Sequence, residues 1–303
     1  MLIYYIGENN LFRLNSDCFE NYNIILNNSG FEIKDPVGRI ANSSNIKKVL
    51  WRKPSLKHDL LIKQEKLSDY EEYIEKEFWY VAREIVNLAW LNEKLVLIEP
   101  LVDFRIGKFV QLNIAKKYFK IADYEFRYKA KSKVFNNEIV IKSLTMQPID
   151  KDNYKVLYTT KTKENELSES EPWFIQDYIE ALYDVTVVFI RDKMFAFELE
   201  RSNFLSKTVD YRELSVDKTA QNWRVHKLRD DTEKNIFKFM DELKLHFGRL
   251  DFLYDDKDYY FLEVNPNGQW LWLDAKNEFG VIEKFIEEVR PDTPINPIPA
   301  RFR

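Results

Sequence analysis

The segment RLDFLYDDKDYYFLEVNPNGQW, residues 249–270, most strongly constrains the fold of this chain. Two runs of alternating apolar and polar residues flank an acidic turn at 255–258, which predicts an antiparallel hairpin. If the turn centres on Lys257, Asp251 lies directly across from Glu263, and Asn265 shares their face because side chains alternate along a strand. The other face is apolar and is expected to pack on the core, with Leu250, Phe252, Leu262 and Val264.

Two carboxylates held opposite each other repel, because cross-strand neighbours have Cβ atoms about 4.5–5.5 Å apart. A divalent cation removes the repulsion, and carboxylate and amide oxygens are the hard ligands typical of Mg²⁺ that also holds phosphates. The hairpin therefore predicts a magnesium site at Asp251, Glu263 and Asn265. The alternative is an acidic, solvated hairpin face on which the two carboxylates do not meet.

Glycine usage narrows how the chain could bind phosphate. It has only seven glycines in 303 residues, and no two lie within five residues of each other. This excludes a GxGxxG dinucleotide loop and a Walker-type phosphate loop. Phosphate binding would need side-chain cations and metal ions. Lys142 is one candidate, because it interrupts the apolar run Ile139–Ile141, where an unpaired cation is costly to bury.

Composition sets broad limits. The chain is 45% hydrophobic, enough for more than one domain, and its net charge of −4 argues against a general nucleic-acid binder. A single cysteine, Cys18, excludes an intrachain disulfide framework and fits a reducing compartment. No apolar run approaches the roughly 20 residues of a membrane span, and the N-terminus lacks signal-peptide features. We expect a cytoplasmic protein that binds neither nucleic acid nor membrane.

Periodicity predicts an α+β, or mixed α/β, architecture. A helix is expected over 67–92, where Ser68 and Glu71 have capping-box spacing. Its apolar stripe consists of Tyr73, Phe78, Val81, Ile85, Leu88 and Leu91. The other expected helices cover 107–119 (with Val110 on its apolar stripe), 232–247 and 278–290. The expected strands cover 2–6, 48–54, 94–100, 138–144, 155–161, 172–179, 183–192, 193–200, 249–255 and 258–266.

The segment FLEVNPNGQWLWLD (261–274) resembles the C-terminal signature of ATP-grasp ligases, and more narrowly that of the ribosomal-peptide maturases that make graspetides, of the microviridin and grasp-with-spasm type. Similarity to this RimK-like family extends over nearly the whole chain. The other segments that carry it are WRKP (51–54), NLAWLN (87–92), GKFVQLNIAKKYF (107–119), IVIKSL (139–144), PWFIQDYIEALYD (172–184) and VDYR (209–212).

The resemblance implies an ATP-grasp fold with an N-terminal pre-ATP-grasp α/β domain. The expected boundaries are 1–100 for the N-terminal domain, 101–190 for a central subdomain with lid and hinge, and 191–303 for a C-terminal subdomain with the metal-binding hairpin. The polar segment 158–171 is the expected lid.

The resemblance also implies ATP and Mg²⁺ as cofactors, and it assigns residues to them. Asp251, Glu263 and Asn265 match the magnesium ligands, and Lys108 and Lys142 match lysines that contact ATP. The remaining matches are Gln176 and Ile179 at the adenine hinge, Asp184 at the ribose, and Asp210 and Arg212 at the acceptor peptide and the carboxylate being activated.

The sequence departs from the family pattern after the hinge. The family usually reads Glu-Leu/Ile-Arg-Val, whereas this chain has Thr186 at the position of the arginine. That arginine would help neutralise phosphate charge, so another arginine would have to replace it. The candidates are Arg201, Arg212 and Arg224.

The function implied is ATP-dependent, ADP-forming ligation through an acyl phosphate. An Asp or Glu side chain of a precursor peptide, made of leader and core, would be joined to a Ser or Thr hydroxyl as an ω-ester, or to a Lys amine. Family analogy implies a homodimer. Two alternatives stay open: a ligase of free amino acids or peptides of the RimK or glutathione-synthetase type, and a degenerate ATP-grasp protein that binds nucleotide or peptide without turnover.

Overall fold

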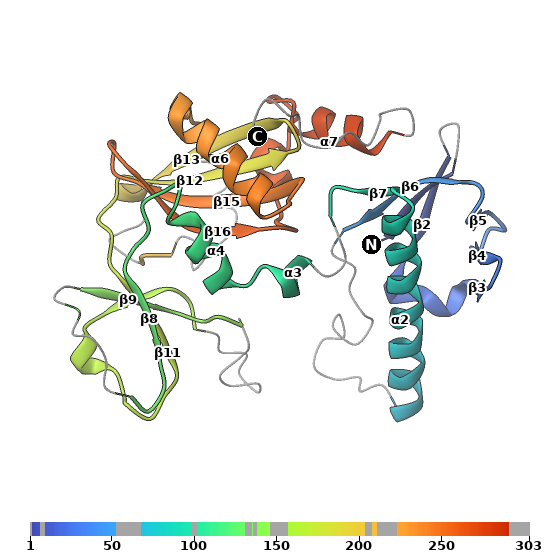
Figure 1. Ribbon diagram of the computed structural model, residues 1–303, viewed down its shortest axis with the longest axis horizontal. Coiled ribbons are helices and arrows are strands. Elements are labelled where there is room, and N and C mark those ends of the chain that lie inside the picture. Colours follow the sequence, from blue (N-terminus) through green and yellow to red (C-terminus); the bar gives the residue numbers. More distant parts are fainter. Residues whose placement is uncertain are drawn as a thin grey trace.

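The computed structural model describes residues 2–6, 10–52, 68–98, 102–130, 135, 138–145, 157–203, 208–210 and 223–290. Within these residues the strands form four sheets, and the named strand pairs are antiparallel except for one parallel pair. Helices lie against the sheets (Figure 1). This is the mixed helix and antiparallel-sheet architecture that the periodicity predicted.

The N-terminal part contains two sheets and a long helix. One sheet has the order β2-β1-β6-β7, formed by Asn10–Leu14, Leu2–Ile6, Ile46–Trp51 and Leu95–Val96. The other has the order β3-β4-β5, formed by Asn23–Asn27, Gly30–Lys34 and Ile40–Asn42. A 3₁₀ helix, η1 (Ser16–Asn21), connects β2 to β3. The predicted strand over 48–54 corresponds to β6, and its last two residues lie outside the described residues.

Helix α2 (Asp69–Leu91) begins where the sequence predicted. The Ser68 hydroxyl accepts a hydrogen bond from the Glu71 N–H at 3.3 Å, and the Glu71 carboxylate accepts one from the Ser68 N–H at 2.9 Å. The predicted apolar stripe is partly wrong, because three of its members are exposed. They are Tyr73, Leu88 and Leu91. Two other members of the predicted stripe, Phe78 and Ile85, are buried, and the same face also buries Ala82, Val86 and Ala89.

A smaller sheet has the order β10-β9-β11-β8. Its strands are Thr160–Thr162, Ile139–Lys142, Trp173–Asp177 and Tyr124–Arg127, with the 3₁₀ helix η2 (Glu164–Glu166) between β10 and β11. Ile139, Ile141 and Ile175 form its small apolar core with Phe135. Because side chains alternate along a strand, Lys142 of β9 and Gln176 of β11 lie on the face away from this core, together with Val140 and Phe174.

The largest sheet has the order β14-β13-β12-β15-β16. Its strands are Arg224–Val225, Lys193–Glu200, Tyr183–Ile190, Phe247–Tyr254 and Tyr259–Asn265. Helix α6 (Asp230–Glu242), expected over 232–247, covers one face with the buried residues Ile236, Phe239 and Met240, and Leu243 directly after it is also buried. The 3₁₀ helices η3 (Arg201–Asn203) and η6 (Leu271–Asp274) and helix α7 (Val281–Val289) complete this part.

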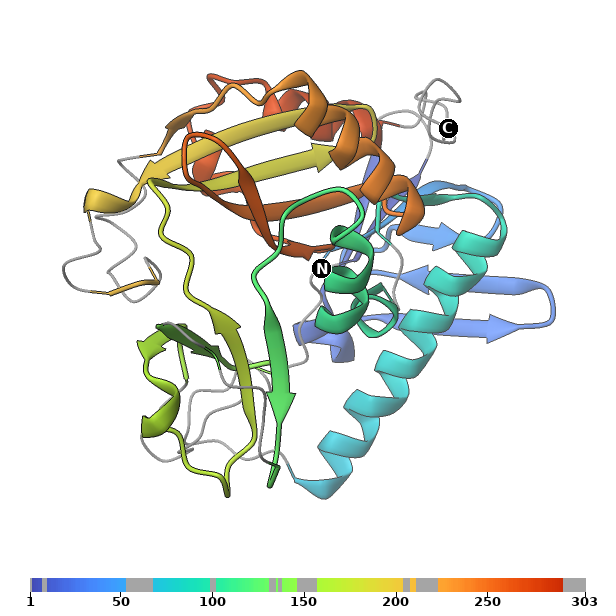
Figure 2. The ribbon, with the colours of Figure 1, turned by 60° about the vertical axis from the view of Figure 1, so that its left-hand side comes forward.

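Helix α4 (Lys108–Ala115) follows the short helix α3 (Val102–Arg105) and lies between the largest sheet and the smaller sheet (Figures 1 and 2). The Phe119 ring stacks on Phe261 and meets Phe252 edge-on, with centroids 5.9 and 5.2 Å apart. Val110, predicted to be buried, is exposed, whereas Gln111 and Leu112 are buried. Among the described residues, no helix is both long and apolar enough to cross a membrane.

Candidate active site

The β15–β16 hairpin has the predicted pairing in the part farthest from its turn, around Asp251. Asp251 pairs with Glu263 and Leu250 with Val264. The register shifts by one residue beyond Asp251, where Phe252 pairs with Phe261, so Leu262 is an extra residue in a β-bulge. The prediction that Leu262 packs on the core is therefore wrong. Leu262 lines a cavity instead, and Phe261 is fully buried in its place.

The Asp251 carboxylate has three donors from two strands. The Thr186 hydroxyl of β12 donates to Oδ1 at 2.6 Å, and Arg249 donates to both oxygens, from Nη2 to Oδ2 at 2.9 Å and from Nε to Oδ1 at 3.2 Å. Thr186 can reach the carboxylate because it pairs directly with Asp251 across the sheet. The site residue is thus held in one orientation by its neighbours on the sheet.

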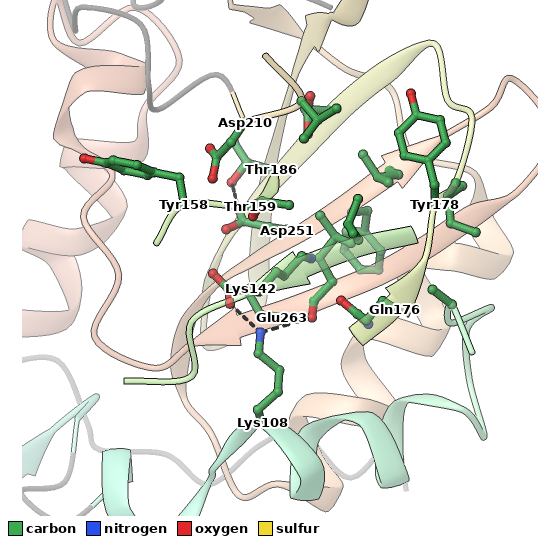
Figure 3. A pocket seen from close by; sticks show the side chains of 18 of the residues that line it. Lys108, Lys142, Tyr158, Thr159, Gln176, Tyr178, Thr186, Asp210, Asp251 and Glu263 are labelled. Atoms are coloured by element: carbon green, nitrogen blue, oxygen red, sulfur yellow. Dashed lines mark hydrogen bonds and ion pairs between the residues drawn. The ribbon is translucent and has the colours of Figure 1, made fainter. Parts of the chain in front are cut away.

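The Glu263 carboxylate forms an ion pair with Lys108, the first residue of α4, at 2.5 Å. Gln111, one turn along the helix, fixes this arrangement: its side-chain oxygen accepts from the Val264 N–H at 2.9 Å and its Nε2 donates to the Ile106 carbonyl at 3.0 Å. The helix is therefore bound to β16 beside Glu263, and Lys108 projects toward that carboxylate (Figure 3).

Asn265, the last residue of β16, also lines the cavity. Its side-chain oxygen accepts from the Asn267 N–H at 3.1 Å, and its carbonyl accepts from the Gly268 N–H at 3.1 Å. The turn after β16 thus orients the Asn265 side chain while leaving a second lone pair on its oxygen.

The smaller sheet provides the opposite wall. Lys142 of β9 and Gln176 of β11 line the cavity, together with Ile179 just beyond β11. Gln176 is 2% exposed, and its side-chain nitrogen has no hydrogen-bond partner among the residues that the structure describes. A buried unpaired donor is costly, so this atom fits a ligand that brings an acceptor.

Two further acidic side chains, Asp184 and Asp210, also line the cavity. Asp184 forms an ion pair with the buried Arg201 at 2.9 Å, and Asp210 is buried nearby. Burial raises the pKa of the Asp184 carboxyl to about 6, and the Arg201 guanidinium opposes that rise.

These residues converge on one cavity of about 360 Å³ (Figure 3). Nine of the ten residues proposed from sequence line it: Lys108, Lys142, Gln176, Ile179, Asp184, Asp210, Asp251, Glu263 and Asn265. The tenth, Arg212, lies outside the described residues.

The donor set fits Mg²⁺. Two carboxylates and an amide oxygen are hard ligands, and the two carboxylates already attract cationic side chains, Arg249 and Lys108. The described residues hold no group of three or more His, Cys, Asp and Glu side chains able to bind a metal, so an ion here would also need the asparagine. Lys108, Lys142 and the unpaired donor of Gln176 fit a nucleotide, whose phosphates need cations and whose base offers acceptors.

Three arginines were predicted as substitutes for the one that position 186 lacks, and one of them, Arg212, lies outside the described residues. Of the predicted substitutes, Arg201 lines the cavity, whereas Arg224 forms an ion pair with Glu198. Arg249 escaped the sequence prediction, although it lies two residues before Asp251 and so shares its face.

The sequence analysis also missed other residues of the candidate site. Gln111 could have been found as the polar residue within an apolar helical stretch. Tyr158, Tyr178 and Trp223 line the cavity without a sequence signal that distinguishes them from packing residues.

The chain was compared with protein-family models, curated proteins and solved structures. No protein-family model and no curated protein matches the sequence. Solved structures do match. A RiPP-associated ATP-grasp ligase from Chryseobacterium gregarium, in complex with ADP and a leader and core peptide, has a TM-score of 0.73 at 20% identity, covering 92% of this chain and 86% of its own.

Two further structures are similar. The macrocyclase MdnC from Microcystis aeruginosa, bound with precursor peptide MdnA, has a TM-score of 0.69 at 20% identity, covering 91% of this chain and 88% of its own. The ATP-grasp ligase PsnB with minimal precursor, Mg and ADP has a TM-score of 0.61 at 14% identity, covering 91% and 88%. The chain therefore has the ATP-grasp fold that its sequence predicted.

Proposed function

We propose that the protein is an ATP-dependent, ADP-forming ligase that macrocyclises a ribosomally made precursor peptide. The observation that carries the proposal is the convergence of two strand-paired carboxylates, an asparagine and two lysines on one cavity. The three similar structures support it, because they are described as RiPP-associated or peptide-binding ligases and macrocyclases in complexes with peptides, and two of them with ADP.

The chemistry begins with a carboxylate of the peptide, which is a poor electrophile. Transfer of the ATP γ-phosphoryl group to it gives an acyl phosphate and ADP, and attack by a hydroxyl or amine then expels phosphate. Each ester or amide link therefore costs one water from the peptide mass. Such transfer needs mainly positioning and charge neutralisation.

Different residues of the cavity would provide the positioning and the charge neutralisation. Asp251, Glu263 and Asn265 would hold Mg²⁺, which when bound neutralises phosphate charge. Lys108 and Lys142 add positive charge from α4 and β9. Because Lys108 and Lys142 come from different walls, the phosphates would lie between the smaller and the largest sheet.

Other residues of the cavity would hold the nucleoside and the peptide. Gln176 and Ile179 would hold the adenine and Asp184 the ribose, since the buried Gln176 amide offers an unpaired donor. Asp210 and Arg212 would contact the acceptor peptide and the carboxylate that is activated. An arginine can bind a carboxylate with two parallel hydrogen bonds. Holding both reacting groups of one peptide makes ring closure effectively unimolecular.

Incubation of the protein with ATP, Mg²⁺ and the peptide encoded beside its gene tests the proposal. We expect ADP release together with loss of one water per link by mass spectrometry. Glu263→Gln should lower ADP release by about 100-fold or more, because even outer partners of metal ligands are worth about 10- to 100-fold. The matched control is Glu278→Gln, a change at an exposed glutamate, which should keep full activity.

The outcomes separate the possible activities. ADP release with free amino acids but not with the precursor would point to a ligase of small substrates. Nucleotide binding without ADP release would indicate a protein without turnover. Ester and amide products differ in their sensitivity to mild base. The lid at 158–171, the boundaries between the three domains, the homodimer and the cytoplasmic location stay predictions.

A further inference from the structure

The turn that follows β16 is held by an arginine from the N-terminal sheet. Arg52, directly after β6, donates from Nη1 to the Asn267 carbonyl at 2.6 Å and to the Asn267 side-chain oxygen, and from Nη2 to the Gly268 carbonyl at 2.8 Å. These contacts span more than two hundred residues of sequence. None of these three residues has a role in the proposed chemistry.

The same turn orients a proposed metal ligand. The N–H of Asn267 donates to the side-chain oxygen of Asn265, and the N–H of Gly268 donates to its carbonyl. Arg52 therefore binds the two residues whose N–H groups fix Asn265. A rotation of this turn would therefore change the orientation of the Asn265 side-chain oxygen in the cavity.

The surroundings of Arg52 strengthen its hydrogen bonds to the turn. Asn267 is 6% exposed, so water cannot easily replace the arginine as donor. The guanidinium also lies over the Phe247 ring, 5.7 Å from its centroid. Burial lowers the pKa of Arg52 to about 10, which still leaves it charged at neutral pH.

Arg249 holds the turn from the other side. It donates from Nη1 to the Gln269 carbonyl at 3.0 Å while its other nitrogens bind Asp251. The turn is thus fixed between two arginines, one of which belongs to the largest sheet and the other to the N-terminal sheet.

We propose that Arg52 is a positioning residue of the cation site, through which the N-terminal sheet sets the orientation of Asn265. This inference rests on the proposed function, because it takes Asp251, Glu263 and Asn265 as the Mg²⁺ ligands. Arg52 acts through the turn and does not touch the reacting atoms.

The test measures ADP affinity by isothermal titration calorimetry with Mg²⁺ and with EDTA. The ratio of the two Kd values is the magnesium-dependent gain, and it does not depend on turnover. Arg52→Met should reduce this gain by about 10-fold or more, as expected for an outer partner of a metal ligand, while leaving the Kd in EDTA unchanged.

The matched control is Lys48→Met. Lys48 also reaches from β6 to the C-terminal part, but its hydrogen bond there is to the Glu288 carbonyl of α7, at 3.1 Å, outside the turn. Lys48→Met should leave the gain unchanged. If Arg52→Met does not fold in a thermal melt, Arg52→Lys keeps the charge without the two-nitrogen fork and should still lose several-fold of the gain.

The outcomes are distinct. A gain unchanged by Arg52→Met while Asp251→Asn lowers it would overturn the positioning role and leave the proposed function intact. Equal losses in Arg52→Met and Lys48→Met would also overturn it, because the effect would then be general docking of the N-terminal sheet. If Asp251→Asn leaves the gain intact, the ligand assignment of the proposed function is wrong and the inference falls with it.

Discussion

The hydrogen bond from Thr186 to Asp251 gives a sharp prediction for Thr186→Val. Valine keeps the shape of threonine and removes only the hydroxyl, which lies 2.6 Å from the Asp251 carboxylate. Thr186 is 1% exposed, so water cannot replace the lost donor. A hydrogen bond to a charged group contributes about 1.5–3 kcal/mol. Asp251 keeps its bonds from Arg249, so we expect a loss near the lower end, about 1.5–2 kcal/mol.

The free energy of unfolding, measured in urea at neutral pH, gives the size of the loss. A double-mutant cycle with Asp251→Ala then tests its cause. In the Asp251→Ala background, Thr186→Val should cost less than about 0.5 kcal/mol, the level at which independent changes add. The matched control is Thr186→Ser, which keeps the hydroxyl and loses a buried methyl worth about 1 kcal/mol. Its cost should be the same in both backgrounds.

A small coupling would refute this reasoning. If Thr186→Val costs the same with and without the Asp251 carboxylate, the hydroxyl does not stabilise that group. Position 186 would then affect stability only through packing. The absence of the family arginine there would also have no link to the orientation of Asp251.

Three further changes test separate features. Burial lowers the pKa of His246 to about 4, so the unfolded chain binds that proton more readily and stability falls as pH drops from about 6.5 to about 4. His246→Gln should remove up to about 3 kcal/mol of this acid sensitivity, measured by urea unfolding across that range, and an unchanged pH profile would contradict it. Ser68→Ala should lower the unfolding free energy by about 1 kcal/mol, with recovery in Ser68→Asp, because the cap of α2 is lost. Gly268→Ala would place a Cβ 2.7 Å from that of Arg249, so we expect a lower melting temperature and a smaller magnesium-dependent gain in ADP affinity, and normal values for both would show that the turn can shift freely.

Local sequence patterns predicted much of the fold. The capping box began α2 at the expected residue, and alternation identified β9, β11, β12, β13, β15 and β16. These features depend on neighbours a few residues apart, for which steric and hydrogen-bonding rules are nearly independent of the rest of the chain. Helix faces were less predictable. In α2 the buried side includes Phe78 and Ile85 of the predicted stripe, whereas Tyr73, Leu88 and Leu91 are exposed, because the neighbouring sheet decides which side is covered.

The candidate site shows the same division. The sequence determined that Asp251, Glu263 and Asn265 share a face of one hairpin, because side chains alternate and the acidic turn limits the register. Only the tertiary structure decided that a bulge at Leu262 brings Asp251 opposite Glu263. It also decided that Lys108 pairs with Glu263, because Gln111 binds the Val264 N–H and holds the helix beside β16. These contacts join segments far apart in the sequence, and their geometry depends on how whole sheets and helices pack against one another.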